Sequence, residues 1–302
     1  MVTLYNLIGG LQMGSIYALI ALGYTMVYGI VQLINFAHGD IMMVGAYSIY
    51  WIMTTSLMKA IAETQPVLAG VVSVLFAVVV CVALGVFVDR VAYKPLRNAP
   101  RISALITAIG ISIALEIIAQ LVFGSGQVNF PTIVPKVTLF KVGRRSINLL
   151  EVLTFAVSVL LMIALTLFVQ TTRTGKAMRA VSEDQGAAML MGVNVDKTIS
   201  ITFGIGCALA AIGSVFYAQK VYYVTPLLGM LPGLKAFVAA VLGGIGSIPG
   251  AMIGGVLLGI IEILGKAYVS TELGDALVFA VLILVLLVKP TGLLGKPVRE
   301  KV

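Results

Sequence analysis

The chain has 302 residues, of which 60% are hydrophobic and 11% are charged, and its mean hydropathy is +1.10. Soluble domains carry about 25% charged residues, so this composition excludes a soluble protein. The formal net charge of +8 does not indicate nucleic-acid binding. The basic residues lie between apolar segments, where lipid headgroups and membrane topology account for them. The composition is that of an all-α, polytopic integral membrane protein.

Apolar segments of membrane-spanning character follow one another along the chain. They cover 4–31, 41–58, 67–88, 102–123, 147–169, 199–219, 234–264 and 276–288. Of the ten prolines, only Pro249 lies inside one of these segments, which supports their bounds. We therefore treat 1–302 as a single transmembrane domain with about eight membrane segments.

The segment 234–264 is interrupted near its centre by the sequence GGIGSIPG at 243–250. Proline inside a helix costs about 3 kcal/mol, so Pro249 and its glycines indicate a break. Glycine recurs every four residues at 246, 250 and 254, and again at 255 and 259. This spacing is typical of close helix packing, while a helix break could also form part of a conduit. The segment is either a re-entrant hairpin or two short spans.

Lys and Arg residues predict the orientation in the membrane. Basic loops usually lie in the cytoplasm, so the basic clusters at 90–101, 173–197 and 289–301 are placed there. The basic loop 124–146 then lies outside and is an exception to this rule. This arrangement predicts an outer N-terminus, a cytoplasmic C-terminus and a 234–264 segment that begins and ends on the outer face.

Side chains for catalysis are scarce. His38 is the one histidine of the chain, so a metal site or a Ser-His-Asp arrangement has few candidates. None of the three GK pairs has the preceding glycine that a Walker A loop requires. We expect no enzyme activity and no metal or cofactor on this chain. His38, beside Asp40, is expected to cap or hydrogen-bond a helix junction.

Ionisable residues inside membrane segments are functional candidates by default. Glu116 and Glu262 lie well inside apolar segments, and each either forms structural hydrogen bonds or lines a path. Two scattered acids are few for a proton or sodium relay, and a sparsely charged interior suits a substrate without net charge. The candidates for a translocation path or helix break are Asn35, His38, Glu116, Gly246, Pro249, Gly250 and Glu262.

The polar stretch SEDQGAAMLMG at 182–192 predicts a short helix over about 183–191. Ser182 is its expected N-cap, and Gln185 completes a capping box. Gly192 is expected to end the helix. A helix this short is marginal alone in water. Its apolar residues 189–191 therefore rest either on the membrane or on a cytoplasmic partner.

Four segments carry a resemblance to a known family. GYTMVYGIVQLINFAHGD (23–40), RVAYKPLRNAPRISALITAIGISI (90–113), AVLGGIGSIPGAMIGG (240–255) and LVLLVKPTGLLG (284–295) resemble characteristic segments of ABC-importer permeases for branched-chain amino acids. The chain is most similar to the first of their two permease subunits, over nearly its whole length. Such permeases dock on an ATPase through a cytoplasmic helix with the pattern Glu-Ala-Ala, three residues, Gly. GAAMLMG at 186–192 matches this pattern except for Gly186 in the place of Glu.

The resemblance implies a multi-subunit importer in the bacterial inner membrane. Its other parts would be a second, homologous permease, two ATPases that bind ATP and Mg, and an extracytoplasmic solute-binding protein that delivers leucine, isoleucine or valine. Within the cytoplasmic loop, about 171–197, the coupling helix would comprise Ser182, Glu183, Asp184, Gln185, Ala187, Ala188 and Gly192. Related permeases carry urea or short amides, which is one alternative. An ion-coupled secondary carrier for amino acids is the other.

Overall fold

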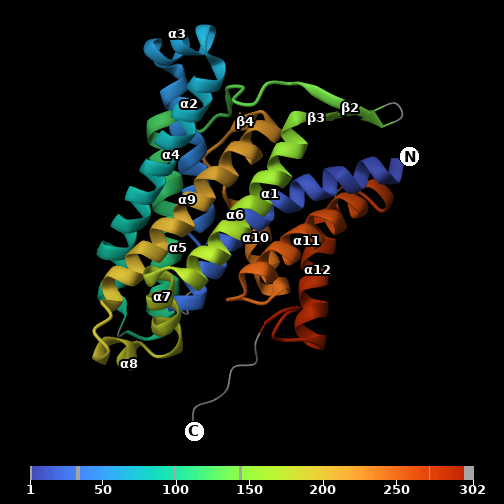
Figure 1. Ribbon diagram of the computed structural model, residues 1–302. Helices are drawn as coiled ribbons and strands as arrows, with labels where there is room; N and C mark the ends of the chain where they lie inside the picture. Colours follow the sequence, from blue (N-terminus) through green and yellow to red (C-terminus); the bar gives the residue numbers. More distant parts are fainter. Residues whose placement is uncertain (1, 32–34, 98, 143–144, 272, 296–302) are drawn as a thin grey trace.

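The structure, a computed structural model, describes residues 2–31, 35–97, 99–142, 145–271 and 273–295 (Figure 1). Most of these residues are helical. The helices are α1 (Val2–Val31), α2 (His38–Thr54), α3 (Ser56–Thr64), α4 (Pro66–Val88), the π-helical turn η1 (Asp89–Tyr93), the 3₁₀ turn η2 (Lys94–Leu96), α5 (Arg101–Phe123), α6 (Leu149–Thr171), α7 (Arg173–Glu183), α8 (Gln185–Leu190), α9 (Val195–Val221), α10 (Met230–Gly243), α11 (Ile248–Tyr268) and α12 (Leu273–Val288). The all-α expectation is confirmed.

Two small antiparallel sheets accompany the helices. β1 (Val128–Asn129) pairs with β4 (Tyr223–Val224), and β2 (Thr138–Val142) pairs with β3 (Arg145–Asn148). Most of these strands belong to a segment predicted only as a loop. They lie with α3 at one end of the bundle, which we call the hairpin end (Figure 1). α7 and α8 lie at the opposite end, which we call the α8 end.

Six of the described helices are long and apolar enough to cross a membrane: α1, α4, α5, α6, α9 and α11. α10 and α12 are shorter apolar helices. α2 and α3 together form a further candidate span that is bent by 81°. The predicted segment 41–58 therefore does not stay straight, because Thr55 adopts an extended conformation and ends α2.

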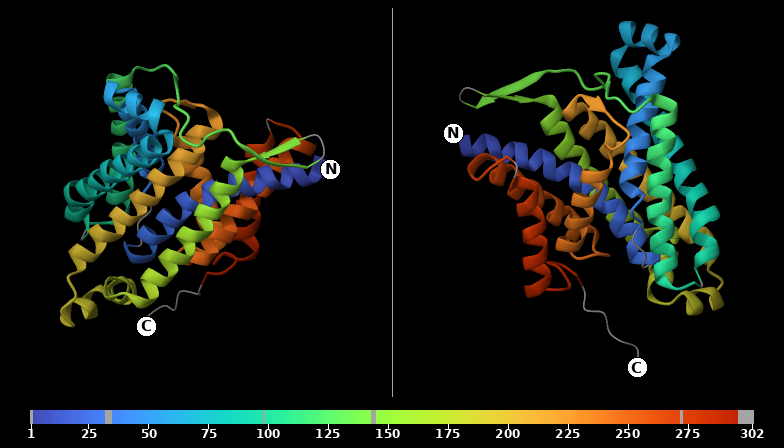
Figure 2. Two further views of the ribbon diagram at one scale, coloured as in Figure 1. Left: turned by 45° about the horizontal axis from the view of Figure 1, so that its top comes forward. Right: turned by 180° about the vertical axis from the view of Figure 1, so that it is seen from behind.

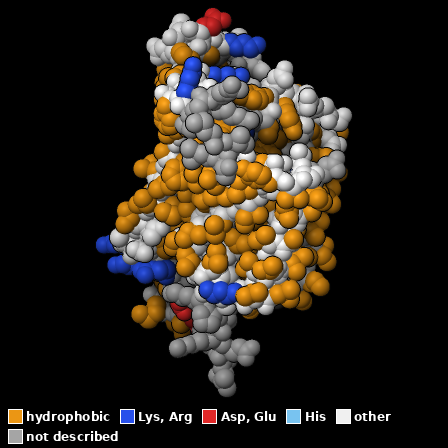
Figure 3. Space-filling view, turned by 90° about the vertical axis from the view of Figure 1, so that its right-hand side faces the viewer, with side chains coloured by type: hydrophobic (Ala, Val, Ile, Leu, Met, Phe, Trp, Pro, Cys, Tyr) orange, Lys and Arg blue, Asp and Glu red, His pale blue; other side chains and the backbone are white. Residues whose placement is uncertain are grey.

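The core of the bundle is built on α1 and α9. In an apolar 18-residue stretch of each helix, the buried share is 83% in α1 and 72% in α9. The same share is only 17% in α5 and in α6. α1 and α9 are therefore enclosed by their neighbours, while α5 and α6 present broad outer faces. On another side of the molecule, toward α11 and α12, Figure 3 shows a wide apolar belt with Lys and Arg side chains above and below it. This distribution fits a protein surrounded by lipid.

Glycines explain how closely α11 packs in the bundle. A Cβ atom on Gly254 would lie 2.2 Å from the Ala239 carbonyl oxygen of α10, and one on Gly259 would lie 2.1 Å from the Gly14 backbone of α1. The two glycine repeats therefore face two different helices, as expected for close packing. Gly246 is an exception, because it lies in the turn between α10 and α11 with φ of +92°.

The basic clusters share one end of the molecule as far as they are described. η1 and η2, α7 and the residues after α12 all lie at the α8 end, whereas the 124–146 loop lies at the hairpin end (Figure 1). Residue 98 of the first basic cluster, residues 143–144 of the basic loop and residues 296–301 of the last basic cluster lie outside the described part of the chain. α1 begins toward the hairpin end and α12 ends at the α8 end, so the two ends of the described chain lie on opposite sides.

Candidate functional site

The short polar helix exists as α8, but its predicted start is wrong. α8 begins at Gln185, and its N-cap is Asp184, whose side chain accepts a hydrogen bond from the Ala187 backbone N–H at 3.0 Å. Ser182 and Glu183 belong to the preceding helix, α7. The Ser182 hydroxyl donates to the Arg179 carbonyl instead of capping α8. Asp caps as well as Ser does, so the extended conformation of Asp184 decides where α8 starts.

The end of α8 exposes three consecutive apolar side chains. Met189, Leu190 and Met191 are 63%, 91% and 84% exposed, whereas Ala188 is buried within the chain itself. Gly192 follows with φ of +82°, which confirms its predicted role as the helix terminator. The surface that α8 offers to other molecules therefore includes three contiguous apolar residues after Ala188, beside the exposed Gln185, Gly186 and Ala187 at its start.

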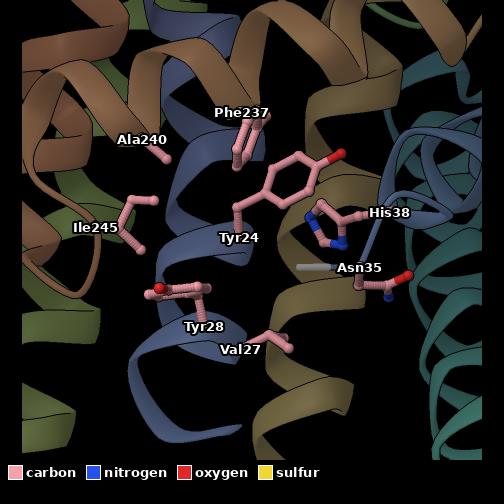
Figure 4. A pocket seen from close by; sticks show the side chains of 8 residues that line it. All are labelled: Tyr24, Val27, Tyr28, Asn35, His38, Phe237, Ala240 and Ile245. Atoms are coloured by element: carbon pink, nitrogen blue, oxygen red, sulfur yellow. The ribbon is translucent and has the colours of Figure 1, made fainter. Parts of the chain in front are cut away.

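A small pocket lies within the bundle, where the start of α2 meets α1 and α10 (Figure 4). The His38 ring packs against Gly23 of α1, and a Cβ atom there would lie 2.4 Å from its Nε2 atom and 3.0 Å from the Gly206 carbonyl oxygen of α9. Gly206 is about 17 Å along α9 from its first residue, which is about half the thickness of a bilayer core. The lining residues are Tyr24, Val27, Tyr28, Asn35, His38, Phe237, Ala240 and Ile245.

Two buried polar groups at this pocket have no hydrogen-bond partner within the described chain. The Asn35 side-chain oxygen accepts from the Tyr93 hydroxyl at 2.7 Å and from the Ala37 N–H at 3.1 Å, which leaves its Nδ2 atom unpaired. The His38 Nε2 atom is also unpaired. Buried polar groups normally find partners. These two groups can therefore serve a polar group that enters the pocket. The rings of Tyr24 and Phe237, which pack edge to face with centroids 6.0 Å apart, also line it.

The pocket is small in this conformation. Its cavity volume is about 10 Å³, which suffices for about one water molecule. Any larger solute requires the surrounding helices to separate.

The predicted helix break forms one wall of this pocket through Ile245. Gly244 and Gly246 adopt φ of +102° and +92°, which glycine allows at little cost. Ser247 then caps α11 by accepting from the Gly250 N–H at 3.2 Å, and Pro249 lies in the first turn of α11. Pro249 thus begins a helix after the break, as its restricted φ favours.

The segment after α12 supports the break from outside the pocket. Leu293 and Leu294 donate backbone hydrogen bonds to the carbonyls of Leu242 and Gly243, both at 2.9 Å. These carbonyls belong to the last turn of α10, where no intrahelical donor remains. We call residues 289–295 the C-terminal strap.

Glu262 belongs to a separate cluster of charges. Its carboxylate accepts hydrogen bonds from Tyr17 of α1 and Lys235 of α10, each at 2.7 Å, and from Lys266 one turn further along α11. Lys235 and Lys266 also pair with Asp275 of α12. The sequence indicated Glu262 but not this cluster. Lys235, within the otherwise apolar stretch that forms α10, and the i,i+4 spacing of Glu262 and Lys266 were the available signals.

Glu116 lies on α5, one turn after Ser112 and on the side of Asp40, and it belongs neither to the pocket lining nor to this cluster. The structure therefore brings together Asn35, His38 and the 243–250 break, and it leaves Glu116 and Glu262 elsewhere. Asp40 does not pair with His38: it accepts a hydrogen bond from Ser112 of α5. His38 instead begins α2, and its backbone N–H bonds the Asn35 carbonyl at 3.1 Å.

Membrane-length helices, an apolar outer belt and a buried pocket beside a helix break define the class of the protein, a polytopic membrane permease. The family described as "Branched-chain amino acid transport system / permease component" matches residues 6–286. The chain belongs to this family.

Relatives of similar length accompany the family match. The high-affinity branched-chain amino acid transport system permease protein LivH of Escherichia coli strain K12 is 47% identical, over 99% of this chain and 97% of its own. BraD of Pseudomonas aeruginosa, with the same description, is 44% identical over 99% and 98%. A probable branched-chain amino acid transport permease protein, LivH of Methanocaldococcus jannaschii, is 33% identical over 95% and 91%. No solved structure matches the chain.

Proposed function

We propose that this chain is a membrane-spanning subunit of an ATP-driven ABC importer for leucine, isoleucine and valine in the bacterial inner membrane. The substrate class follows from the transport systems named for the relatives. The observation that carries the ATP-driven mechanism is the exposed apolar end of α8. Contiguous exposed apolar side chains mark interaction sites on proteins.

The partner of α8 is an ATPase subunit. Leu190 is 91% exposed at the tip of a connection between two membrane helices, where it can enter an apolar groove of another protein. Methionines on both sides supply flexible side chains that adapt to such a groove. Asp184, Gln185, Ala187 and Gly192 form and terminate the helix that presents this tip.

Movement of α8 reaches the pocket through its neighbours in the chain. α7 joins α8 to α6, and a four-residue connection joins α8 to α9. α9 in turn carries Gly206, which lies beside Gly23 and the His38 ring. A displacement of α8 by ATP binding or hydrolysis therefore shifts a helix that packs directly behind the pocket.

The pocket receives the amino acid when the helices separate. Val27, Phe237 and Ile245 provide apolar surface for a branched alkyl side chain, and Asn35 and His38 provide polar groups for its charged end. The positive φ of Gly244 and Gly246 makes the break the natural place for this separation. Alternating access then consists of opening the pocket first toward one membrane face and then toward the other.

The complete importer contains four further chains. They are a second, homologous permease, two ATPases with ATP and Mg, and an extracytoplasmic solute-binding protein. We assign the α8 end to the cytoplasm, because basic residues of η1, η2 and α7 lie there. The N-terminus then lies outside and the C-terminus in the cytoplasm.

Two alternative functions differ from this proposal in the expected partner or in the expected solute. A permease for another small uncharged or zwitterionic solute, such as urea or a short amide, would keep the ATPase partner but transport a different solute. An ion-coupled secondary carrier would work without an ATPase. The pairing of Glu262 with two lysines speaks against the carrier, because it leaves this acid without an uncompensated charge for ion binding.

Co-purification of the tagged chain from membranes tests this proposal. The wild-type chain is expected to bring down ATPase subunits, and Leu190→Glu is expected to lose them. Leu57→Glu is the matched control, since Leu57 is 71% exposed on α3 at the hairpin end. Retention of the ATPases by Leu190→Glu would exclude α8 as the docking element. Leucine uptake by liposomes that contain this chain alone would favour the secondary carrier.

A further inference from the structure

The π-helical turn η1 interrupts the regular hydrogen bonding of a long helix at the α8 end of the molecule. It follows α4 directly, and α4 lies beside α9 down to that end (Figure 2). A π turn at the end of an α-helix is rare, and such turns are frequent at functional sites. Side chains of η1 and of the residues just after it contact α9 at three levels, and one of them also contacts a pocket residue.

Charged groups form the first contacts, at the start of α9. Asp196 pairs with Lys94 at 2.8 Å and with Arg97. The pair of Lys94 and Asp196 is about half exposed and contributes little to stability. Asp89 of η1 is fully buried; it pairs with Arg97 at 3.0 Å and accepts a hydrogen bond from the hydroxyl of Ser200 on α9. Asp89 thus fastens η1 to the first turns of α9, which follow α8 after a four-residue connection.

Tyr93 makes the next contact with α9 and also holds the pocket residue Asn35. The Tyr93 ring packs on Phe203 of α9 with centroids 5.4 Å apart. Its hydroxyl donates to the Asn35 side-chain oxygen at 2.7 Å, where the Ala37 N–H donates as well. The amide of Asn35 cannot turn over without losing both hydrogen bonds, because its nitrogen is only a donor. Tyr93 therefore keeps Nδ2 as the atom of Asn35 that has no partner within the described chain.

These contacts follow one face of α9 from the α8 end to the pocket. Asp196, Ser200 and Phe203 are spaced by four and three residues. Gly206 comes three residues later and lies beside Gly23, behind the pocket. Spacings of three and four residues place side chains on one face of a helix. Over about 15 Å, the same face of α9 therefore contacts first η1 and then the pocket wall.

We propose that Asp89 and Tyr93 are positioning residues for Asn35. Asp89 ties η1 to the α8 end of α9, and Tyr93 holds the Asn35 amide in the orientation that receives the amino acid. A displacement of α8 moves the start of α9, and Asp89 transmits this movement to η1. The Tyr93 hydroxyl then shifts against Asn35, so the ATPase end controls the hydrogen-bonding group of the pocket. This inference rests on the proposed function, since it requires an ATPase at α8.

The importer reconstituted in liposomes, with its ATPases and its solute-binding protein loaded with leucine, tests the role of Tyr93. Tyr93→Phe removes the hydroxyl but keeps the ring on Phe203. It is expected to retain the ATPases and to lower the leucine transported per ATP hydrolysed by about three- to tenfold, the change expected for one hydrogen bond. The binding-protein concentration for half-maximal uptake should not change. Tyr47→Phe is the matched control with a wild-type ratio, because the buried Tyr47 hydroxyl has no partner within the described chain.

Ser200→Ala tests the connection between η1 and α9. This change removes the hydrogen bond to Asp89, and it is expected to lower the same ratio although Ser200 does not line the pocket. The double variant Tyr93→Phe, Ser200→Ala should lose no more than the more impaired single variant, because both changes interrupt one route. Ser214→Ala is the matched control, since the Ser214 hydroxyl bonds only the Ala211 carbonyl of its own helix.

A merely structural role gives a different result. Loss of folded importer lowers uptake and ATP hydrolysis by the same factor, and this outcome, or an unchanged ratio in Tyr93→Phe, would overturn the positioning role. An unchanged ratio in Ser200→Ala, or losses that multiply in the double variant, would overturn the route through η1. Absence of ATP-dependent leucine uptake by the wild-type importer would instead overturn the proposed function.

Discussion

Removal of the Lys235 amine is expected to destabilise the bundle through the charge cluster at Glu262. The amine lies 2.7 Å from Glu262 Oε1 and 2.7 Å from Asp275 Oδ1, and the Glu262 side chain is fully buried. Breaking a buried ion pair costs about 3–5 kcal/mol. Lys266 still pairs with Glu262, and Asp275 is 39% exposed, so we expect Lys235→Met to lower the free energy of unfolding by about 2–4 kcal/mol.

The double variant Lys235→Met, Glu262→Met provides the decisive comparison. Either single change leaves an odd number of charges in the cluster, whereas the double change leaves the pair of Lys266 and Asp275 at 3.1 Å. The loss of unfolding free energy in the double variant should therefore be smaller than the sum of the two single losses by about 1–3 kcal/mol. Reversible unfolding of the purified chain in mixed micelles, followed by circular dichroism, measures these differences. Additivity of the two single changes within about 0.5 kcal/mol would refute the balanced cluster.

Other variants test the helix cap, the strap and the glycine packing. Asp184→Ala should weaken α8 by about 1 kcal/mol and reduce ATPase co-purification, while Ser182→Ala should change neither, since Ser182 does not cap α8. Gly292→Val should lower the thermal midpoint of the purified chain, because Gly292 has φ of +74° and its Cβ would lie 2.5 Å from a carbonyl oxygen of α10. Gly255→Leu should prevent the chain from reaching a monodisperse folded state in size-exclusion chromatography, because its Cβ would lie 2.6 Å from the backbone of α1. Wild-type behaviour of Asp184→Ala would contradict the helix cap, and wild-type behaviour of Gly292→Val or Gly255→Leu would contradict the close packing at that glycine.

Hydropathy predicted where the apolar helices lie and their order, because each membrane helix must be apolar over most of its length. Of the about eight predicted segments, six or seven correspond to described helices long enough to cross a membrane. The small antiparallel strands and the bend after Thr54 were not predictable in this way. They depend on backbone conformations in short polar stretches, where several turns have similar energies. The position of the helix break was predictable from Pro249 and its glycines, since these residues disfavour a continuous helix.

The candidate site was predictable only in part. Asn35 and His38 were selected as polar residues beside an apolar segment, but their meeting with Ile245 depends on how α1, α2 and α10 pack. The start of α8 was misplaced by two residues, because Ser182 and Asp184 are equally good caps and the extent of α7 decides between them. Lys235 was overlooked because its charged partners, Glu262 and Asp275, come from two other helices, which no local pattern reveals.

The C-terminal strap gives the order of synthesis a role in folding. Leu293 and Leu294 provide the hydrogen-bond donors for the end of α10, yet the ribosome adds them about fifty residues after that helix is complete. Until then, the last carbonyls of α10 have no donor from the strap. The turn that carries Ile245 can therefore reach its final shape only when translation is almost finished, and a chain truncated before Leu293 would keep its other helices but lack this last closure.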